Sequence, residues 1–161
     1  MNRLKLGFVS FGFLGLSPVA PGTAGTLGGV ALAWALGHTQ AYLFWTVLAC
    51  VLLYAGGRAL GPWSEAYAGG KDPGFFVVDE VIGYLITVAW TRGPSPLALT
   101  VAFFLFRFLD VVKPPPARAL ERLGGGDGIL MDDVMAGLYG LLAMAGLRLF
   151  TLTPESWVLG P

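Results

Sequence analysis

The sequence predicts an all-α fold, a single bundle of five to six short apolar helices within one domain spanning residues 1–161. Hydrophobic residues make up 55% of the chain and charged residues only 12%, against about 25% charged residues in an ordinary soluble domain. The stretch 6–57 contains no Asp, Glu, Lys or Arg. Gly- and Pro-rich turns separate the apolar runs, and no convincing alternating strand pattern is present.

The helices are expected in two pairs followed by a last one. The first pair covers 27–36 and 41–57 around a turn at 37–40, and the second covers 81–91 and 97–112 around a turn at 92–96. The last helix runs from about 129 to 150. The helix 41–57 would be roughly 25 Å long, slightly short of a bilayer core. The apolar segment 6–16, preceded by Arg3 and Lys5, is interpreted as an uncleaved interfacial lead-in.

We expect this bundle to be embedded in a membrane or strongly associated with one. A soluble bundle needs a polar outer face on each helix, whereas the stretch 43–53 offers only Thr46. A buried soluble core remains the alternative explanation for such short apolar helices.

The charges sort to one end of the bundle if the helices alternate in direction. Segments 1–26, 58–80 and 107–133 would then share an end that holds eight of the ten basic and nine of the ten acidic residues. The positive-inside tendency places this end at the cytoplasm. The net charge is zero, so no basic excess exists for binding nucleic acid.

Single copies of cysteine and histidine exclude several kinds of site. Cys50 alone rules out a disulfide framework and a thiolate zinc cluster, and it lies in apolar sequence without a phosphate-binding Arg just downstream. His38 alone removes sites that need two imidazoles, and it falls at the end away from the charges.

A Gly- and Thr-rich turn at 17–26 leads directly into an apolar helix. Gly22 and Gly25 let backbone N–H groups approach a ligand, and a helix N-terminus favours anions. Thr23 or Thr26 would cap the helix and donate a hydroxyl to a phosphate. A plain N-cap and turn is the alternative interpretation.

Two pairs of adjacent acids precede or enter apolar helices at this same end. They are Asp79 with Glu80 and Asp132 with Asp133. Such pairs would repel each other unless a cation lay between them, and oxygen-only ligands select a hard ion, Mg²⁺ first. The alternative is that these are solvated first-turn acids that interact with the helix dipole. Ala136 and Gly137, one turn further on, permit close approach of another helix.

A third charged group lies at the end of the helix 97–112. Arg107 and Asp110 share a helix face in an apolar stretch, and Lys113 precedes three prolines that end the helix. Ionisable residues in such a setting indicate function, although a structural ion pair is the alternative.

Together these segments supply a metal site, an anion clamp and a phosphate-binding turn. That combination is typical of phosphoryl transfer or phosphomonoester hydrolysis, here on a lipid delivered by the bilayer. A membrane cation carrier that uses the acids and a non-catalytic membrane scaffold are the alternatives.

The sequence resembles the phosphatidylglycerophosphatase A family at four segments in the family's order. They are Ala20 to Thr26, Asp79 to Gly83, Phe106 to Pro114 with Arg107, Asp110 and Lys113, and Asp132 to Gly137. The resemblance implies an all-α, Mg²⁺-dependent enzyme of the bacterial inner membrane. Such an enzyme hydrolyses phosphatidylglycerophosphate to phosphatidylglycerol and inorganic phosphate.

On this hypothesis each group of residues has a role. Asp79, Glu80, Asp132 and Asp133 hold the metal, with Asp79 also counted as catalytic. Arg107 clamps the phosphate, Lys113 adds charge, and Asp110 either orients Arg107 or acts as a base. Gly22, Thr23, Gly25 and Thr26 bind the substrate's phosphate oxygens. Water is the expected nucleophile, and a covalent aspartyl-phosphate stays open.

Overall fold

A computed structural model of the protein describes residues 2–120, 123–150 and 154–159. The described residues form helices and turns without a β-strand, which confirms the all-α prediction. Within these ranges, seven α-helices and two short 3₁₀ helices follow one another: α1 (Asn2–Val9), η1 (Leu14–Leu16), α2 (Pro21–Gly37), α3 (Tyr42–Ala68), α4 (Val78–Thr87), α5 (Pro96–Val112), α6 (Ala117–Leu120), α7 (Gly125–Phe150) and η2 (Pro154–Trp157).

Helix α3 is longer than the sequence predicts, because it continues for eleven residues beyond Gly57. The prediction that it ends there was wrong for a physical reason. Gly57 and Gly61 are packing positions: a methyl group added at Gly57 would lie 3.2 Å from Leu130, and one at Gly61 would overlap with Gly126 of α7. These glycines let α3 and α7 cross closely instead of ending the helix.

Helix α4 lies at the centre of the molecule and packs most extensively against α7. Gly83 and Gly137 meet at this crossing, where a methyl group added at Gly83 would lie 2.7 Å from the carbonyl oxygen of Asp133. The Thr87 hydroxyl donates a hydrogen bond to the Gly83 carbonyl. The small residues after the second acid pair therefore do permit the close helix approach that the sequence predicts.

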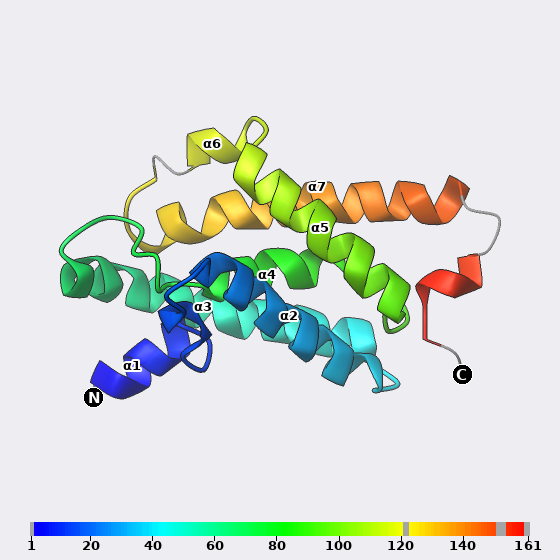
Figure 1. Cartoon of the computed structure of the whole chain (residues 1–161), viewed down its shortest axis with the longest axis horizontal. Helices are drawn as coiled ribbons and strands as arrows, with labels where there is room; N and C mark the ends of the chain where they lie inside the picture. Colours follow the sequence, from blue (N-terminus) through cyan, green and yellow to red (C-terminus); the bar gives the residue numbers. More distant parts are fainter. Residues whose placement is uncertain (1, 121–122, 151–153, 160–161) are drawn as a thin grey trace.

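The helices alternate in direction and carry their charges to one end, as the sequence predicts. Figure 1 shows the N-termini of α2, α4 and α7 at the same end as the C-termini of α3 and α5. We call this the acidic end and the opposite one the far end. Two of its predicted charged members, Glu121 and Arg122, lie outside the described residues.

Helices α3 and α7 are long and apolar enough to cross a membrane, judged by length and composition. They differ in burial: only 11% of the most apolar 18-residue window of α3 is buried within the protein, against 44% for α7. Large apolar side chains such as Phe44, Val51 and Leu52 are exposed along α3. This outer surface is suited to lipid contact and supports the predicted membrane association.

Candidate active site

The first acid pair lies in the first turn of α4, at the acidic end. Asp79 is only 7% exposed, and its carboxylate oxygen accepts a hydrogen bond from the backbone N–H of Glu80 at 3.1 Å. The apolar residues Val77, Val78, Val81 and Ile82 around the pair are buried in the core. The packing of α4 therefore draws Asp79 into the protein interior and leaves Glu80 half-buried beside it.

The second acid pair lies about two turns inside α7 and is also buried. This helix begins at Gly125, four residues earlier than expected, and Asp132 and Asp133 are 6% and 3% exposed. The alternative interpretation as solvated first-turn acids was therefore wrong for this pair. Burial of acids at this depth requires a cation or a bound proton nearby.

Three of the four predicted metal ligands come together. One carboxylate oxygen from each of Asp79, Glu80 and Asp133 lies within 4.8 Å of the others. Among the described residues, the Glu80 Oε2 atom is buried without a hydrogen-bond partner. The possible ligands are all hard oxygen atoms, and one of these side-chain oxygens lacks a hydrogen-bond partner within the ranges that the structure describes. This triad can therefore hold a metal ion.

Burial and mutual repulsion change the acidity of the pair on α4. Desolvation, followed by the neighbouring Glu80 charge, raises the pKa of Asp79 well above its ordinary value. Desolvation also raises the pKa of Glu80, while its hydrogen bond with Asp79 and the nearby Arg107 charge act in the opposite direction. A divalent cation would offset the same repulsion without protonating the acids.

Asp132, the fourth predicted ligand, lies outside the triad and is paired with Lys113. The Lys113 Nζ atom donates to Asp132 Oδ2 at 2.7 Å. The other oxygen, Oδ1, is buried and has no hydrogen-bond partner within the described part of the chain. Its role as a metal ligand stays a prediction, whereas its contact with Lys113 is a feature that the sequence did not predict.

Arg107 and Asp110 form the predicted pair on the last two turns of α5. The Arg107 Nη1 atom donates to Asp110 Oδ2 at 2.6 Å, and both side chains are largely buried. Both groups act electrostatically on Glu80. The residues named so far bring five carboxyl groups and two cationic side chains together, which leaves an excess of negative charge for a cation to balance.

The N-terminus of α2 completes the site. A methyl group added at Gly22 would overlap with Glu80 Oε1 and lie 3.2 Å from Arg107 Nη1. Because Gly22 has no side chain, the backbone at the start of α2 can lie directly against Glu80 and Arg107. The positive end of the α2 helix dipole therefore lies beside these two charged groups. Gly22 of the predicted phosphate-binding turn therefore lies beside Glu80 and Arg107, and its role in phosphate binding stays a prediction.

The other residues of that turn have different surroundings. Helix α2 begins at Pro21 with Ala20 as its N-cap and without a side-chain cap, so the prediction that Thr23 or Thr26 caps it was wrong. Thr26 is buried, and its hydroxyl donates to the Gly22 carbonyl at 2.9 Å. Gly25 packs closely against Val77. Thr23 is half-buried in the first turn.

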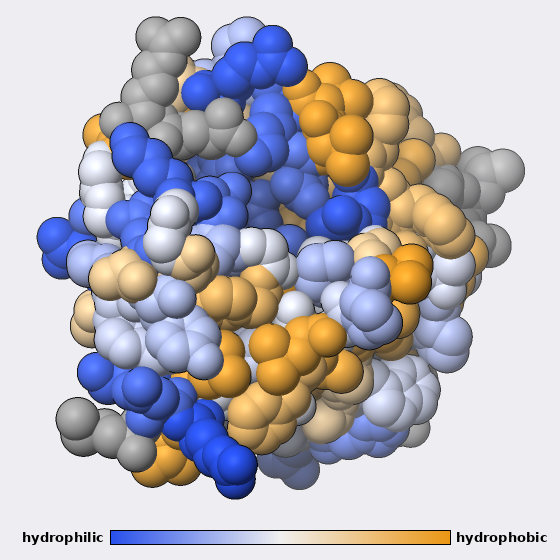
Figure 2. Space-filling model, turned by 60° about the vertical axis from the view of Figure 1, so that its left-hand side comes forward, coloured by the Kyte–Doolittle hydropathy of each residue, from blue (hydrophilic) through white to orange (hydrophobic). Residues whose placement is uncertain are grey.

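The surface of this end combines polar and apolar character. Figure 2 shows hydrophilic side chains around a hollow, with hydrophobic side chains bordering it. Exposed apolar residues on neighbouring segments include Leu16, Val19, Phe108 and Val111. A polar recess with an apolar border is suited to a molecule whose charged head and apolar body arrive together.

Comparison with known proteins agrees with the family resemblance found at four segments of the sequence. The family model described as phosphatidylglycerophosphatase A matches residues 7–148. The chain is similar to a protein of Haemophilus influenzae named phosphatidylglycerophosphatase A, at 38% identity over 94% of this chain and 93% of that protein. An Escherichia coli protein with the same name is 34% identical over 90% of this chain and 83% of its own length.

A third relative has a different printed name. A Bacteroides thetaiotaomicron protein named putative phosphatidylinositol-3-phosphatase is 38% identical over 91% of this chain and 89% of that protein. No solved structure matches the chain at a significant level.

Proposed function

Since the chain belongs to the phosphatidylglycerophosphatase A family of phosphatases, we propose that it hydrolyses phosphatidylglycerophosphate to phosphatidylglycerol and inorganic phosphate. One observation carries the proposal: Arg107 and the N-terminus of α2 lie against a buried acid triad at the end of an apolar bundle. Because the chain belongs to a family of enzymes, the alternative that it is mainly a cation carrier is disfavoured.

We propose Mg²⁺ as the cofactor, held by Asp79, Glu80 and Asp133, with Asp132 as a further ligand. Mg²⁺ matches a set of carboxylate oxygens and usually keeps several waters. When bound, the ion would polarise the phosphoryl group and lower the pKa of water.

Arg107 would bind the terminal phosphate. Its planar guanidinium can donate two parallel hydrogen bonds to phosphate oxygens, and the backbone N–H groups at the start of α2 would donate to the remaining ones. The contact with Asp110 fixes the guanidinium orientation. Asp110 is therefore assigned as a positioning residue for Arg107.

Lys113 would add positive charge beside the leaving group, held in place by Asp132. The oxygen of a water molecule forms the new bond to phosphorus while the bond to the lipid's glycerol oxygen breaks, and a proton lost by the water ends on that glycerol oxygen. The developing negative charge on the phosphoryl oxygens is what Arg107 and Lys113 would stabilise.

We also propose that the site faces the cytoplasm at the inner membrane of a bacterium. Seven of the nine basic residues that the structure describes belong to the segments of the acidic end, and basic residues favour the cytoplasmic side. Phosphatidylglycerophosphate would then reach the site laterally from the cytoplasmic leaflet.

Phosphate release from the pure protein tests the proposal. The detergent-purified protein should release phosphate from phosphatidylglycerophosphate with Mg²⁺ and lose this activity with EDTA. Restoration by excess Mg²⁺ controls for unfolding. Hydrolysis that persists in EDTA would contradict the metal assignment, and no hydrolysis of any phosphomonoester would contradict the function.

The name of the Bacteroides relative provides a second candidate substrate, phosphatidylinositol 3-phosphate. Both lipids present a phosphate monoester on a headgroup next to a membrane. The ratio of their kcat/KM values, measured in the same mixed micelles, decides between them. A ratio that favours the inositol lipid would overturn the substrate proposal and leave the phosphatase assignment intact.

A further inference from the structure

An apolar groove lies between α2 and α5 on the outer surface of the bundle. Its volume is about 390 Å³, and it is lined by Leu27, Val30, Ala31, Trp34, Pro96 and Leu99. Tyr84 of α4 lies between the two helices: its hydroxyl donates to the Leu99 carbonyl at 2.9 Å, and its ring is close to Gly29. The side chain of Tyr84 thus lies between α2 and α5, next to Leu99 of the groove lining.

Both helices that line the groove also carry residues of the candidate active site. On α2, Leu27 follows Thr23 by one helical turn and Gly22 by five residues, with Ala31 and Trp34 further along the same face. On α5, Leu99 and Arg107 are separated by two turns. The apolar walls therefore lead to the positions where Gly22 and Arg107 lie against Glu80.

Both helices that line the groove also carry exposed apolar side chains. Leu27 and Trp34 are exposed on α2, and Leu97, Phe104 and Phe108 are exposed on α5. An elongated ligand that is anionic at one end and apolar along its length matches this distribution, since Arg107 and a helix N-terminus favour the anion.

We propose that the α2–α5 groove holds an acyl chain of the lipid substrate while the phosphate lies at Arg107. This inference rests on the proposed function and adds the path by which the lipid enters the site. The chain would lie along α2 from Leu27 toward Trp34. The groove would thus select acylated substrates over the same headgroup without chains.

A second apolar groove, of about 390 Å³, lies on the other side of α4 and is lined in part by Cys50, Ala55 and Ile86. It is less suited to the lipid because its polar end is already neutralised. Arg58 lies there and donates to Asp127 at 3.0 Å, and the Tyr54 hydroxyl donates to the same carboxylate. This groove provides a matched control.

Tryptophan substitutions can fill one groove at a time. Ala31→Trp fills the α2–α5 groove, and Ala55→Trp fills the second groove. Ala143→Trp adds a side chain of the same size at an exposed position that lines neither groove. Each variant is assayed on dioleoyl phosphatidylglycerophosphate in mixed micelles and on the same headgroup without acyl chains. A thermal melt by circular dichroism verifies folding, and Ala31→Leu serves as a milder second variant.

We expect Ala31→Trp to lower kcat/KM for the dioleoyl lipid about tenfold, since losing contact with roughly two methylenes costs that factor. Turnover of the chain-free headgroup should change less than about twofold in all variants, and Ala31→Leu should show a smaller loss in the same direction. Equal losses on both substrates, a loss matched by Ala143→Trp, or a loss confined to Ala55→Trp would each overturn the groove assignment. Failure of the unsubstituted protein to hydrolyse either substrate would instead refute the proposed function.

Discussion

The two ends of the bundle both contain charged residues but use them differently. At the acidic end the side chains of Asp110 and Asp132 are 13% and 8% exposed. At the far end, Arg92 and Glu155 form an ion pair at 3.6 Å with side chains 47% and 88% exposed. The acids of the candidate site are largely buried, whereas Glu155, the described acid of the far end, is solvated. Arg148 at the far end is also buried, but it lies over the Trp90 ring. Burial is what raises the free energy of an unbalanced charge.

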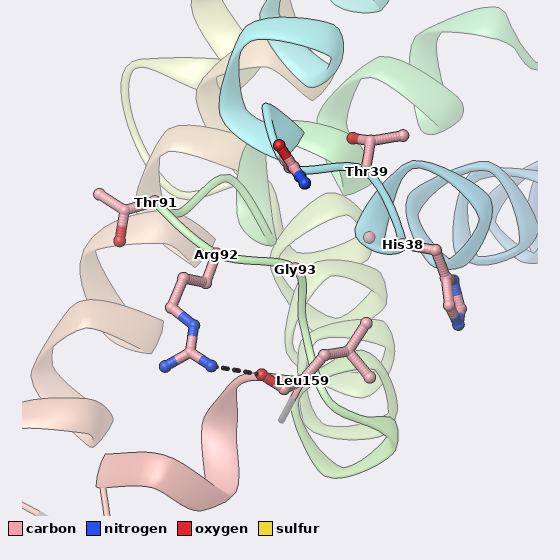
Figure 3. A pocket seen from close by; sticks show the side chains of 8 residues that line it. His38, Thr39, Thr91, Arg92, Gly93 and Leu159 are labelled. Atoms are coloured by element: carbon pink, nitrogen blue, oxygen red, sulfur yellow. Dashed lines mark hydrogen bonds between the residues drawn. The ribbon is translucent and has the colours of Figure 1, made fainter. Parts of the chain in front are cut away.

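The far end nevertheless has a cavity of about 620 Å³, lined in part by His38, Thr91 and Gly93. Figure 3 shows Arg92 pointing toward Leu159, to whose carbonyl oxygen it donates at 2.9 Å. The backbone of Gly93 accepts from Leu159, and the Ser95 hydroxyl donates to the Ser156 carbonyl. These contacts attach the segment 154–159 to the rest of the bundle. Cavity size alone would therefore point to the end opposite the proposed site.

The largest expected effect is at the acid triad. Asp133→Asn should lower kcat about 10³-fold, since the metal contributes several kcal/mol to the barrier reduction. Phosphate release from the lipid in Mg²⁺ measures it. Asp127→Asn is the matched control, because that acid lies on the same helix but pairs with the exposed Arg58. Equal losses in both variants would mean that buried and exposed acids at this end do not differ in function.

Substitution of Arg107 should have the second-largest effect on activity. Arg107→Lys keeps the charge but removes the paired donors, so kcat/KM should fall about 10²-fold. Asp110→Asn should reproduce a part of this loss if the acid orients the guanidinium. Unchanged kinetics in Arg107→Lys, measured over a full substrate range, would identify the pair as a structural ion pair only.

Asp132 could act as a metal ligand or through its contact with Lys113, and a substitution can separate these two roles. Asp132→Asn should lower activity about 10- to 100-fold through loss of the Lys113 contact and of a further ligand. The Mg²⁺ concentration for half-maximal activity distinguishes them. If this concentration rises, Asp132 acts on the metal; if it stays constant while kcat falls, the residue acts through Lys113. Near-normal turnover would remove Asp132 from the site.

Most residues of the candidate site can be recognised in the sequence because they follow a local pattern. Acids entering an apolar helix, or an Arg and an Asp three residues apart, can be recognised within a few positions. Two features depend on how distant helices pack, which no local pattern encodes. One is the contact between Lys113 and Asp132; the other is that Asp133, and not its neighbour Asp132, joins the acids of α4. The end of α3 was misplaced because a glycine that terminates a helix and a glycine that packs against another helix look alike in sequence.

Gly22 tests the close approach of α2 to the acids. Gly22→Ala would place a methyl group against the flexible end of Glu80 and near Arg107, so activity should fall about tenfold through misplacement of these groups. The loss of stability should be small, about 1 kcal/mol, because a side-chain end can move. Gly70→Ala, at the same end but with open space around the added methyl, should change neither. Normal activity in Gly22→Ala would show that the turn does not contact the substrate.

The smallest effect is expected at the far end, where the larger cavity lies. Arg92→Gln removes an exposed ion pair and a hydrogen bond to the Leu159 carbonyl. Exposed pairs contribute at most about 1 kcal/mol. Arg92 follows the C-terminus of α4, whereas Asp79 and Glu80 of the triad lie in the first turn of that helix. Activity should therefore change less than about twofold, while a thermal melt should show a slight loss of stability. A loss of phosphate release comparable to that of Arg107→Lys would mean that the two ends are coupled, and that the buried acids alone do not define the functional end of the molecule.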